Sequence, residues 1–368
     1  RYGGAPLYSG MVSQWTWKHG QQPENDYVFS YDGVGRLVAA KHFVDGARTD
    51  GYTERGIRYD ANGNLLAISR TAGGAVSDSL RFTLGGDVLL DVSGTSTGVF
   101  EYDPSGNLVK DGLNRLEFSY NCLNLMQTVQ TTVGASKAQF TYGSDGRKLS
   151  ARAGTGGFEY LGSLIYAYRG GTLSLAQAVT DEGTIQSAGV NYFIRDHLGS
   201  VRAVVDHTGK IVERNDYYPF GGRHENSALS LSATNRYKFG GKESLEPVSL
   251  DMLDFGARFY DPRIARWNTQ DPLAEKYFSL SPYNYCAGNP ITLVDPTGMV
   301  MDDYRLKKNG EIELMKKTND NYDVIYAENE KGEIDLFNTI SIDRGILSNK
   351  ITGTITPHGK EYSYDAYG

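Results

Sequence analysis

FSYDGVGRLVAAKH, residues 29–42, is the first of four stretches that share one pattern. The others are IRYDANGNLLAISR (57–70), FEYDPSGNLVKDG (100–112) and FTYGSDGRKLSARA (140–153). Each runs through an aromatic or apolar residue to a Tyr, turns through Asp and Gly, and returns at a Leu. Asp and Gly favour tight turns, because Gly adopts the positive φ that other residues resist. The pattern predicts one β-hairpin per unit, with positive φ at Gly35, Gly63, Gly106 and Gly146.

The spacing of the repeats indicates how the hairpins assemble. Successive repeat tyrosines are 28, 43, 18 and 22 residues apart, at Tyr31, Tyr59, Tyr102, Tyr120 and Tyr142. Arms of unequal length argue against a solenoid of identical rungs and favour a long antiparallel sheet that its own twist curls. The 44 glycines and 26 tyrosines among 368 residues suit turns and strands. We therefore expect an all-β protein of antiparallel hairpin repeats, in which the tyrosines are strand residues rather than ligand-binding residues. We expect residues 1 to about 270 to form one curved sheet whose first strand is an exposed edge.

Charge and composition narrow the function classes. The net charge of −7 argues against nucleic-acid binding by the sheet. No run of apolar residues is long enough for a transmembrane helix. Cys122 and Cys286 are the only cysteines, too few for a disulfide framework or a zinc motif. We expect no metal and no cofactor. Because the sequence opens with RYGGAP in what reads as mid-repeat, we also expect a piece of a longer protein.

A second signal is GARFYDPRIARWNTQDPLAEKYFSLSPYNYCAGNPITLVDPTGM, residues 256–299. Three of the 11 prolines follow aspartate here, in Asp261-Pro262, Asp271-Pro272 and Asp295-Pro296. Proline fixes φ and moves the preceding residue out of the helical region, so each pair predicts a rigid turn. Such turns can hold carboxylates in fixed places.

Paired carboxylates have a defined chemistry. Two of them placed close together share a proton, because both cannot ionise cheaply. The ionised one can activate water, and the protonated one can polarise a peptide carbonyl and assist the leaving amine. A nearby arginine can fix one carboxylate bidentately. The same residues also suit a purely structural role, since Asp-Pro turns and Arg–Asp pairs often hold loops together.

ARFYDPRIARWNTQDPLAEKY and PYNYCAGNPITLVDPTGM resemble the core domain of Rhs/YD-repeat proteins, the RHS repeat-associated core, in the form common in Bacteroidetes-like bacteria. The resemblance is dense from about Arg195 to Met299 and looser over 27–194. It implies a strip of hairpins curled into a hollow β-shell that encloses a cargo segment. The implied parts are a YD-repeat strip (1–192), a core with a self-cleavage site (193–299) and a variable, β-rich C-terminal segment (300–368).

The functional residues of the family carry over one at a time. The arginine before the first Tyr-Asp-Pro corresponds to Arg258, and the second and third Asp-Pro pairs supply Asp271 and Asp295. The family cuts after a hydrophobic residue that follows Asp-Pro-x-Gly, usually Leu. Here that residue is Met299, so the resemblance implies cleavage between Met299 and Val300. The implied activity is that of a self-cleaving aspartic-type autoprotease that acts once.

Several neighbouring residues are interpreted as structural. Tyr260 is interpreted as structural only, Trp267 as a packing anchor and Arg266 as a surface or aromatic-stacking residue. Asp196 and His197 are expected to form a capped turn with a buried imidazole rather than a catalytic pair. DPLAEKYFSL, residues 271–280, predicts a short helix with its N-cap at the first Asp.

The C-terminal segment has its own pattern. Residues 302–339, DDYRLKKNGEIELMKKTNDNYDVIYAENEKGEIDLFNT, predict strands joined by turns at Asn309-Gly310 and Lys331-Gly332. The segment contains no hydrolase, zinc or phosphate-binding motif, and His358 is its only histidine. We therefore assign it no activity.

Three functions compete at this stage. The first is the carrier part of a secreted or cell-surface polymorphic toxin, with its own C-terminal segment as cargo and with a secretion apparatus and an immunity protein as partners. The second is a non-enzymatic surface or adhesion protein whose Asp-Pro turns are staples. The third is a glycan-binding β-module. The set of Arg258, Asp271 and Asp295 favours the first over the second, and an open aromatic groove would favour the third.

Overall fold

The computed structural model describes residues 11–225, 235–248, 250–276 and 278–299, followed by six strands between residues 302 and 365. The chain forms two compact units, Arg1–Val294 and Asp295–Gly368. Val300, His358 and the predicted turns at Asn309-Gly310 and Lys331-Gly332 lie outside the described residues. No α-helix occurs in the described part of the chain, which confirms the predicted all-β class.

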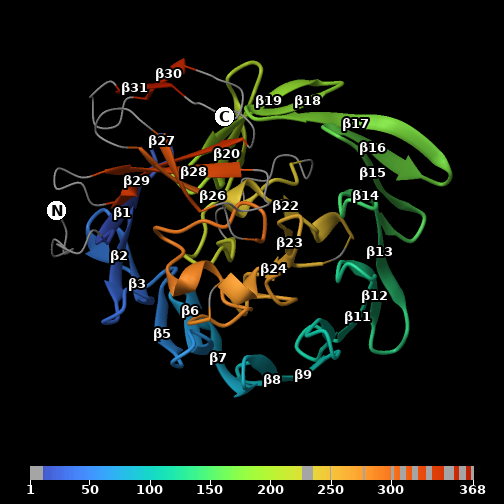
Figure 1. The fold of residues 1–368 in the computed structure, drawn as a ribbon, viewed down its shortest axis with the longest axis horizontal. Coiled ribbons are helices and arrows are strands. Elements are labelled where there is room, and N and C mark those ends of the chain that lie inside the picture. The colour runs from blue at the N-terminus through green and yellow to red at the C-terminus, as the bar shows by residue number, and fades with distance from the viewer. Residues whose placement is uncertain are drawn as a thin grey trace. The chain divides into compact units, whose positions relative to one another are not determined.

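One antiparallel sheet of 21 strands dominates the first unit (Figure 1). Each strand pairs with the next along the chain, except that β3 pairs with both β4 and β5 and the short β4 pairs only with β3 among the described strands. The strands are β1 (Gln14–Trp17), β2 (Asn25–Tyr31), β3 (Leu37–Val44), β4 (Ala47–Arg48), β5 (Glu54–Tyr59), β6 (Leu65–Ala72), β7 (Ala75–Gly85), β8 (Val88–Gly94), β9 (Gly98–Tyr102), β10 (Leu108–Asp111), β11 (Leu116–Tyr120), β12 (Met126–Thr131), β13 (Ser136–Tyr142), β14 (Lys148–Ala153), β15 (Gly156–Leu161), β16 (Leu164–Arg169), β17 (Thr172–Thr180), β18 (Gly183–Gln186), β19 (Gly189–Arg195), β20 (Val201–Asp206) and β21 (Ile211–Arg214). The predicted meander of hairpins is confirmed.

The turn of each repeat is built by its aspartate. Asp32 Oδ1 accepts hydrogen bonds from the amides of Val34 (3.1 Å) and Arg36 (2.9 Å), and the Asp32 amide donates to the Arg36 carbonyl. The turn at Asp103 has the same bonds. The four repeat glycines have φ between 78° and 88°, as predicted, at Gly35, Gly63, Gly106 and Gly146. A bulge follows in β2, where the register shifts between Ser30 and Tyr31.

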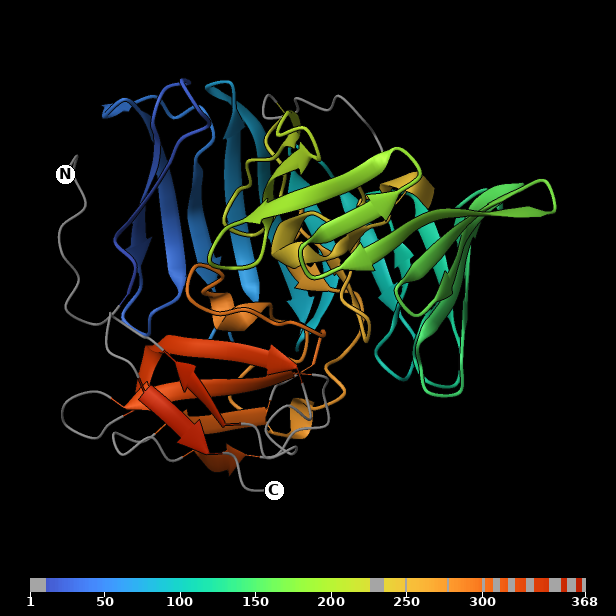
Figure 2. The ribbon, with the colours of Figure 1, turned by 90° about the horizontal axis from the view of Figure 1, so that it is seen from above.

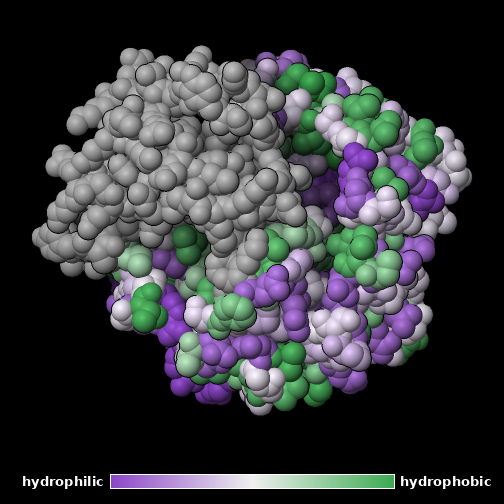
Figure 3. Space-filling view, viewed as in Figure 1, coloured by the Kyte–Doolittle hydropathy of each residue, from purple (hydrophilic) through white to green (hydrophobic). Residues whose placement is uncertain are grey.

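The repeat tyrosines bind each hairpin to the one before it. The Tyr59 hydroxyl donates to the Leu37 carbonyl (2.8 Å), in the return strand of the preceding repeat. Tyr120 donates in the same way to Leu108 (2.7 Å). Tyr142 donates to the Met126 carbonyl (2.8 Å). Satisfying buried backbone carbonyls in this way makes the tyrosines part of the wall, as the sequence predicted. On the face seen in Figure 3, hydrophilic and hydrophobic residues are interspersed over the described surface.

The large sheet ends at Arg214, whereas the repeat pattern led us to expect one sheet to about residue 270. The chain turns inward instead, and residues 215–293 cover the inner face of the curved sheet (Figures 1 and 2). The physical reason is that the apolar face of a sheet has to be buried against another layer. The predicted boundary at residue 193 lies inside β19.

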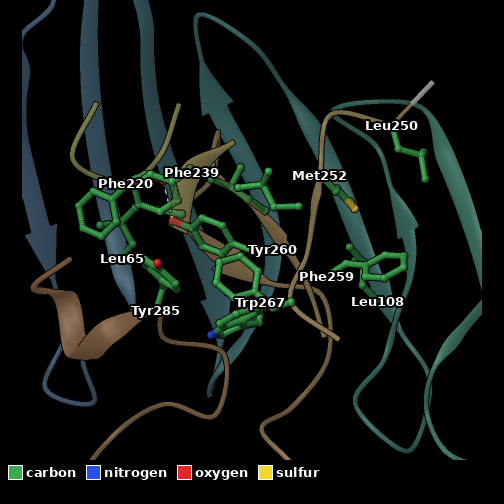
Figure 4. Close-up of a cluster of buried hydrophobic side chains, with 14 of the residues drawn as sticks. Leu65, Leu108, Phe220, Phe239, Leu250, Met252, Phe259, Tyr260, Trp267 and Tyr285 are labelled. Carbon is green, nitrogen blue, oxygen red and sulfur yellow. Dashed lines mark hydrogen bonds between the residues drawn. The ribbon is translucent and has the colours of Figure 1, made fainter. Parts of the chain in front are cut away.

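The described residues of this covering segment, 215–225, 235–248, 250–276 and 278–293, form short elements. They are a four-stranded antiparallel sheet of β22 (Glu243–Ser244), β23 (Leu253–Asp254), β24 (Phe259–Asp261) and β25 (Arg266–Trp267), and the 3-10 turns η2 (Phe239–Gly241), η3 (Glu246–Val248), η4 (Ala274–Lys276) and η5 (Cys286–Gly288). Tyr260 and Tyr285 stack with their ring centroids 4.2 Å apart, and Trp267 lies against both. Figure 4 shows these rings in a cluster of buried side chains that also contains Leu65 and Leu108 of the sheet, with Leu108 next to Phe259. Trp267 is 1% exposed, which confirms it as a packing anchor.

The first strand meets the end of the sheet through side chains. The Trp15 ring lies 5.0 Å from that of His197, and the guanidinium of Arg202 in β20 lies 5.4 Å from Trp15. His19 Nε2 lies 2.9 Å from an Asp216 carboxylate oxygen. The open edge that we expected at the first strand is therefore lined by aromatic and charged contacts.

The second unit is a smaller β-structure. A four-stranded sheet has the order β27 (Ile312–Lys316), β26 (Asp302–Leu306), β28 (Tyr322–Glu328) and β29 (Ile334–Asp343), and β30 (Thr352–Ile355) pairs with β31 (Tyr362–Asp365). The predicted hairpin pairings of β26 with β27 and of β28 with β29 are confirmed. However, β28 pairs in parallel with β26 rather than forming a hairpin with β27. Short-range turn signals do not encode that crossover.

Two histidines are buried in the first unit, His42 in strand β3 and His224 in the covering segment. His42 and His224 are each 3% exposed, with ring centroids 6.2 Å apart. The His224 ring stacks on Tyr52 at 4.1 Å, and its Nε2 lies 2.9 Å from the Tyr27 hydroxyl. Burial lowers the pKa of His42 to about 4, and burial also holds the pKa of His224 well below its usual value.

The lowered pKa values of these histidines predict that the folded state becomes less stable at acidic pH. His42 in the unfolded chain protonates below pH 6.5, but in the folded chain only near pH 4, so stability falls as the pH drops through this window. The loss from this residue is about 3 kcal/mol at most. We expect the melting temperature to fall between pH 6.5 and 4, and to fall less in His42→Gln. His207→Gln, at an exposed histidine, is the control and should keep the wild-type slope. A wild-type melting temperature that stays constant over this range would contradict the prediction.

Candidate functional site

Arg258 belongs to the covering segment, lies immediately before β24 and is buried. Its Nη2 lies 2.8 Å from Asp271 Oδ2, and its Nη1 donates to the Pro282 carbonyl at 3.1 Å. The guanidinium carbon lies 4.2 Å from the centroid of the Trp267 ring. The Arg258 side chain is 1% exposed and that of Asp271 is 15% exposed. The arginine is thus held rigidly from three sides and directs one N–H at a carboxylate that solvent still reaches.

The position of Asp271 is set by its backbone as well as by the arginine. Its amide donates to the Pro282 carbonyl (2.9 Å), and its Oδ1 accepts from the Leu273 amide (2.8 Å). The predicted helix over 271–280 is wrong: among the residues described there, the structure has the 3-10 turn η4 and no α-helix. The bonds from Arg258 and Asp271 to Pro282 pull the chain back within eleven residues, which leaves no room for a helix.

Asp295, the first residue of the second unit, organises a tight turn. Its Oδ1 accepts from three successive amides, those of Thr297 (3.3 Å), Gly298 (2.7 Å) and Met299 (3.1 Å). Gly298 has φ 72°, a conformation that glycine adopts without strain. The turn therefore fixes the Met299 end of the peptide bond that the sequence marks for cleavage.

Of the three predicted site residues, the structure brings Arg258 and Asp271 together. Asp295 belongs to the second unit and is described with its own turn. Thr297 was missed by the sequence reasoning, although its Oγ1 donates to the Met299 carbonyl at 3.3 Å. The signal was its position between Asp295 and the predicted cut. Pro282 was also missed, and nothing in the sequence marks its carbonyl as the common partner of Arg258 and Asp271.

The first Asp-Pro pair is a structural staple. Arg70 of β6 pairs with Glu54 of β5 at 2.6 Å and donates from Nη2 to the Pro262 carbonyl at 3.0 Å. Asp261 Oδ1 accepts from the Arg263 amide (2.8 Å). These bonds fasten the turn to the sheet.

Two other sequence interpretations can be compared with the contacts. Arg266 is 6% exposed and lies 4.5 Å above the Tyr283 ring, so the stacking interpretation is confirmed and the surface interpretation is wrong. Asp196 Oδ1 accepts from the amides of Leu198 and Ser200, both at 3.0 Å. His197 Nε2 contacts the Ile291 carbonyl at 3.1 Å. The expected capped turn is therefore confirmed, but the expected buried imidazole is wrong, because His197 is exposed.

A carboxyl group with a strongly raised pKa lies away from the predicted site. Burial, followed by the neighbouring Asp111, raises the pKa of Asp261 to about 7. Burial also raises the pKa of Asp111. Asp261 is 4% exposed and Asp111 is 1% exposed, so this pair is closed to substrates.

In the described part of the chain, no helix has the length and hydropathy to cross a bilayer. The described residues also contain no group of three His, Cys, Asp or Glu side chains arranged to hold a metal ion.

A meander of Tyr-Asp hairpins whose inner face is covered by the chain's own following segment defines a YD-repeat shell. The chain belongs to the teneurin YD-shell family, which matches residues 8–291. The resemblance found in the sequence is thereby confirmed, and the fold is that of a β-shell.

Individual relatives match parts of much longer proteins. The chain is 26% identical over 314 residues to double-stranded DNA deaminase toxin A of Burkholderia cenocepacia (strain H111), covering 74% of this chain and 20% of that protein. It is 31% identical over 112 residues to toxin subunit YenC1 of Yersinia entomophaga, covering 30% of this chain and 11% of that one. The crystal structure of TcdB2-TccC3-Cdc42 matches with a TM-score of 0.49 and 18% identity, over 75% of this chain and 17% of that chain. The chain thus spans a fifth or less of the length of these proteins.

The buried carboxyl of Asp261 predicts a stabilising substitution. Its folded-state pKa of about 7 lies above the ordinary 3.8, so its contribution to stability is present below pH 3.8 and is lost as the pH rises through 7. At pH 8 the buried charge costs at most about 4 kcal/mol. Asp261→Asn keeps an oxygen that accepts from Arg263 and should raise the melting temperature at pH 8, with little effect near pH 4.5.

Asp181→Asn, at an exposed aspartate, is the control and should change neither value. Equal destabilisation by Asp261→Asn at both pH values would show that the carboxylate itself is required.

Proposed function

We propose that this chain is the carrier part of a polymorphic toxin, which encloses its C-terminal segment and releases it by a single self-cleavage between Met299 and Val300. The observation that carries the proposal is the buried Arg258–Asp271 ion pair, with an N–O distance of 2.8 Å. The Arg258 guanidinium is 1% exposed and is held by Trp267 and Pro282. Removing a charge from water costs on the order of several kcal/mol, as much as a whole favourable interaction contributes. This cost is large for a residue that only holds a turn, and it therefore favours a functional role.

The proposed chemistry divides the reaction between two carboxylates. Asp271, oriented by Arg258, takes a proton from a water molecule whose oxygen bonds to the Met299 carbonyl carbon. The tetrahedral intermediate then collapses, the bond to the Val300 nitrogen breaks, and the leaving amine receives a proton from the second carboxyl, Asp295. The scissile peptide is part of the same chain, so a modest catalyst suffices for one turnover.

The names of the relatives support the class of cargo that we propose. The proteins similar to this chain include a double-stranded DNA deaminase toxin and a toxin subunit, which supports a toxin as the enclosed cargo. In this proposal residues 1–192 and 193–299 form the strip and core of the carrier, and the segment from residue 300 onward begins the cargo. The carrier acts in a secreted or cell-surface setting, with a secretion apparatus and an immunity protein as partners.

Self-cleavage is tested on the chain with a different tag at each end. Wild type should appear on a denaturing gel as two fragments, the larger about 33 kDa, from 299 of 368 residues in a chain of 40.5 kDa. Asp271→Asn and Asp295→Asn preserve shape but cannot ionise, so each should remain uncut. Arg258→Lys keeps the charge but loses the planar fork, and should slow cleavage about 10-fold or more.

The matched control is Asp261→Asn, the same change at the first Asp-Pro pair, which should leave cleavage intact. Mass spectrometry of the fragments should give termini at Met299 and Val300. If folded wild type persists as a single chain at neutral pH, the aspartates and the arginine are staples and the protein is a non-enzymatic shell.

A further inference from the structure

The carbonyl at the proposed cut has a hydrogen-bond donor of its own. Thr297 Oγ1 lies 3.3 Å from the Met299 carbonyl oxygen and donates to it. Thr297 is 9% exposed, so this bond is sheltered from water. Both residues belong to the turn that the Asp295 carboxylate holds, and the donor is therefore fixed relative to its acceptor.

In this turn Asp295 shapes the backbone, whereas the donor to the Met299 carbonyl is another residue. Asp295 Oδ1 accepts from the amides of Thr297, Gly298 and Met299, and so acts in the structure as an acceptor that shapes the backbone. The donor aimed at the Met299 oxygen is the threonine hydroxyl instead. A hydrogen-bond donor placed where negative charge develops stabilises the transition state more than the starting state, and so accelerates the reaction.

We propose that Thr297 polarises the Met299 carbonyl during cleavage, with its hydroxyl as the hydrogen-bond donor to the developing oxyanion. This inference rests on the proposed self-cleavage at that bond. When the water oxygen bonds to the carbonyl carbon, the π electron pair moves onto the Met299 oxygen. The Thr297 hydroxyl donates a hydrogen bond to this negatively charged oxygen. The pair returns as the bond to the Val300 nitrogen breaks, and the hydroxyl keeps its proton throughout.

The structural alternative is that the hydroxyl only closes the turn. Thr297→Val keeps the β-branched shape and removes the hydroxyl, whereas Thr297→Ser keeps the hydroxyl and removes a methyl group. If the hydroxyl polarises the carbonyl, Val should slow cleavage about 100-fold and Ser should remain within about 10-fold of wild type. Thr292→Val, the same change five residues upstream, is the control and should cleave like wild type.

The rates are measured by pulse–chase in cell-free translation, from pH 5 to 8. Because a threonine hydroxyl does not titrate in this range, Val should lower the rate by the same factor at every pH. Melting temperatures are compared between two proteins that carry Asp271→Asn and are therefore uncut, one with Thr297 and one with Thr297→Val. The two temperatures should agree within about 2 °C if the turn is intact.

Each outcome decides the question. If wild type cleaves and Thr297→Val cleaves at the wild-type rate, the inference is wrong and the proposed function stands. If Ser is as slow as Val, or if Val lowers the melting temperature in the uncut background, the hydroxyl serves the turn and the inference is also wrong. If wild type does not cleave, the proposed function fails, and this role fails with it.

Discussion

Covering the inner face of the 21-stranded sheet is the constraint on which the rest of this structure depends. A meander of hairpins satisfies its own backbone hydrogen bonds, but it leaves one apolar face that must be removed from water. The chain meets this requirement with the segment that follows the last strand. Phe220, Phe239, Phe259 and Trp267 of that segment are all nearly inaccessible to solvent, and they pack with strand residues such as Phe140 in one core. The shell is therefore a two-layer structure whose second layer is largely irregular.

An irregular layer needs specific contacts to hold one position, and buried ion pairs provide them. Lys148 of β14 pairs with Glu243 at 2.8 Å and also with Asp254, both in the covering segment. Arg70 of β6, which is itself paired with Glu54, holds the turn after Asp261 by donating to the carbonyls of Pro262 and Arg263. Pairs of this kind add little net stability, but removing one partner leaves a buried charge that costs about 3–5 kcal/mol. Their effect is to select one register of the segment against the sheet.

The same constraint explains where the candidate chemistry lies. Arg258 and Asp271 are part of the covering segment, so the packing that buries the sheet also fixes the distance between them. Trp267 contributes to both tasks, since one face of it joins the aromatic core and the Arg258 guanidinium lies over its ring. A site built on such a segment gains its rigidity from the whole shell rather than from a local helix or strand.

The sequence by itself determined the repeating hairpin, because the aspartate and glycine of each turn act through bonds within five residues. The resemblance of residues 256–299 to the Rhs/YD-repeat core also placed Arg258 and Asp271 in one candidate site. The sequence did not determine where the sheet ends, why residues 271–280 are not a helix, or that β28 runs parallel to β26. Those features depend on contacts between residues far apart in the chain, such as the bonds of Arg258 and Asp271 to Pro282, and local patterns carry no information about them. Only the tertiary structure brought the Thr297 hydroxyl and the Met299 carbonyl into view as a pair, because a threonine side chain can bond to several backbone groups and the fold of the turn selects one.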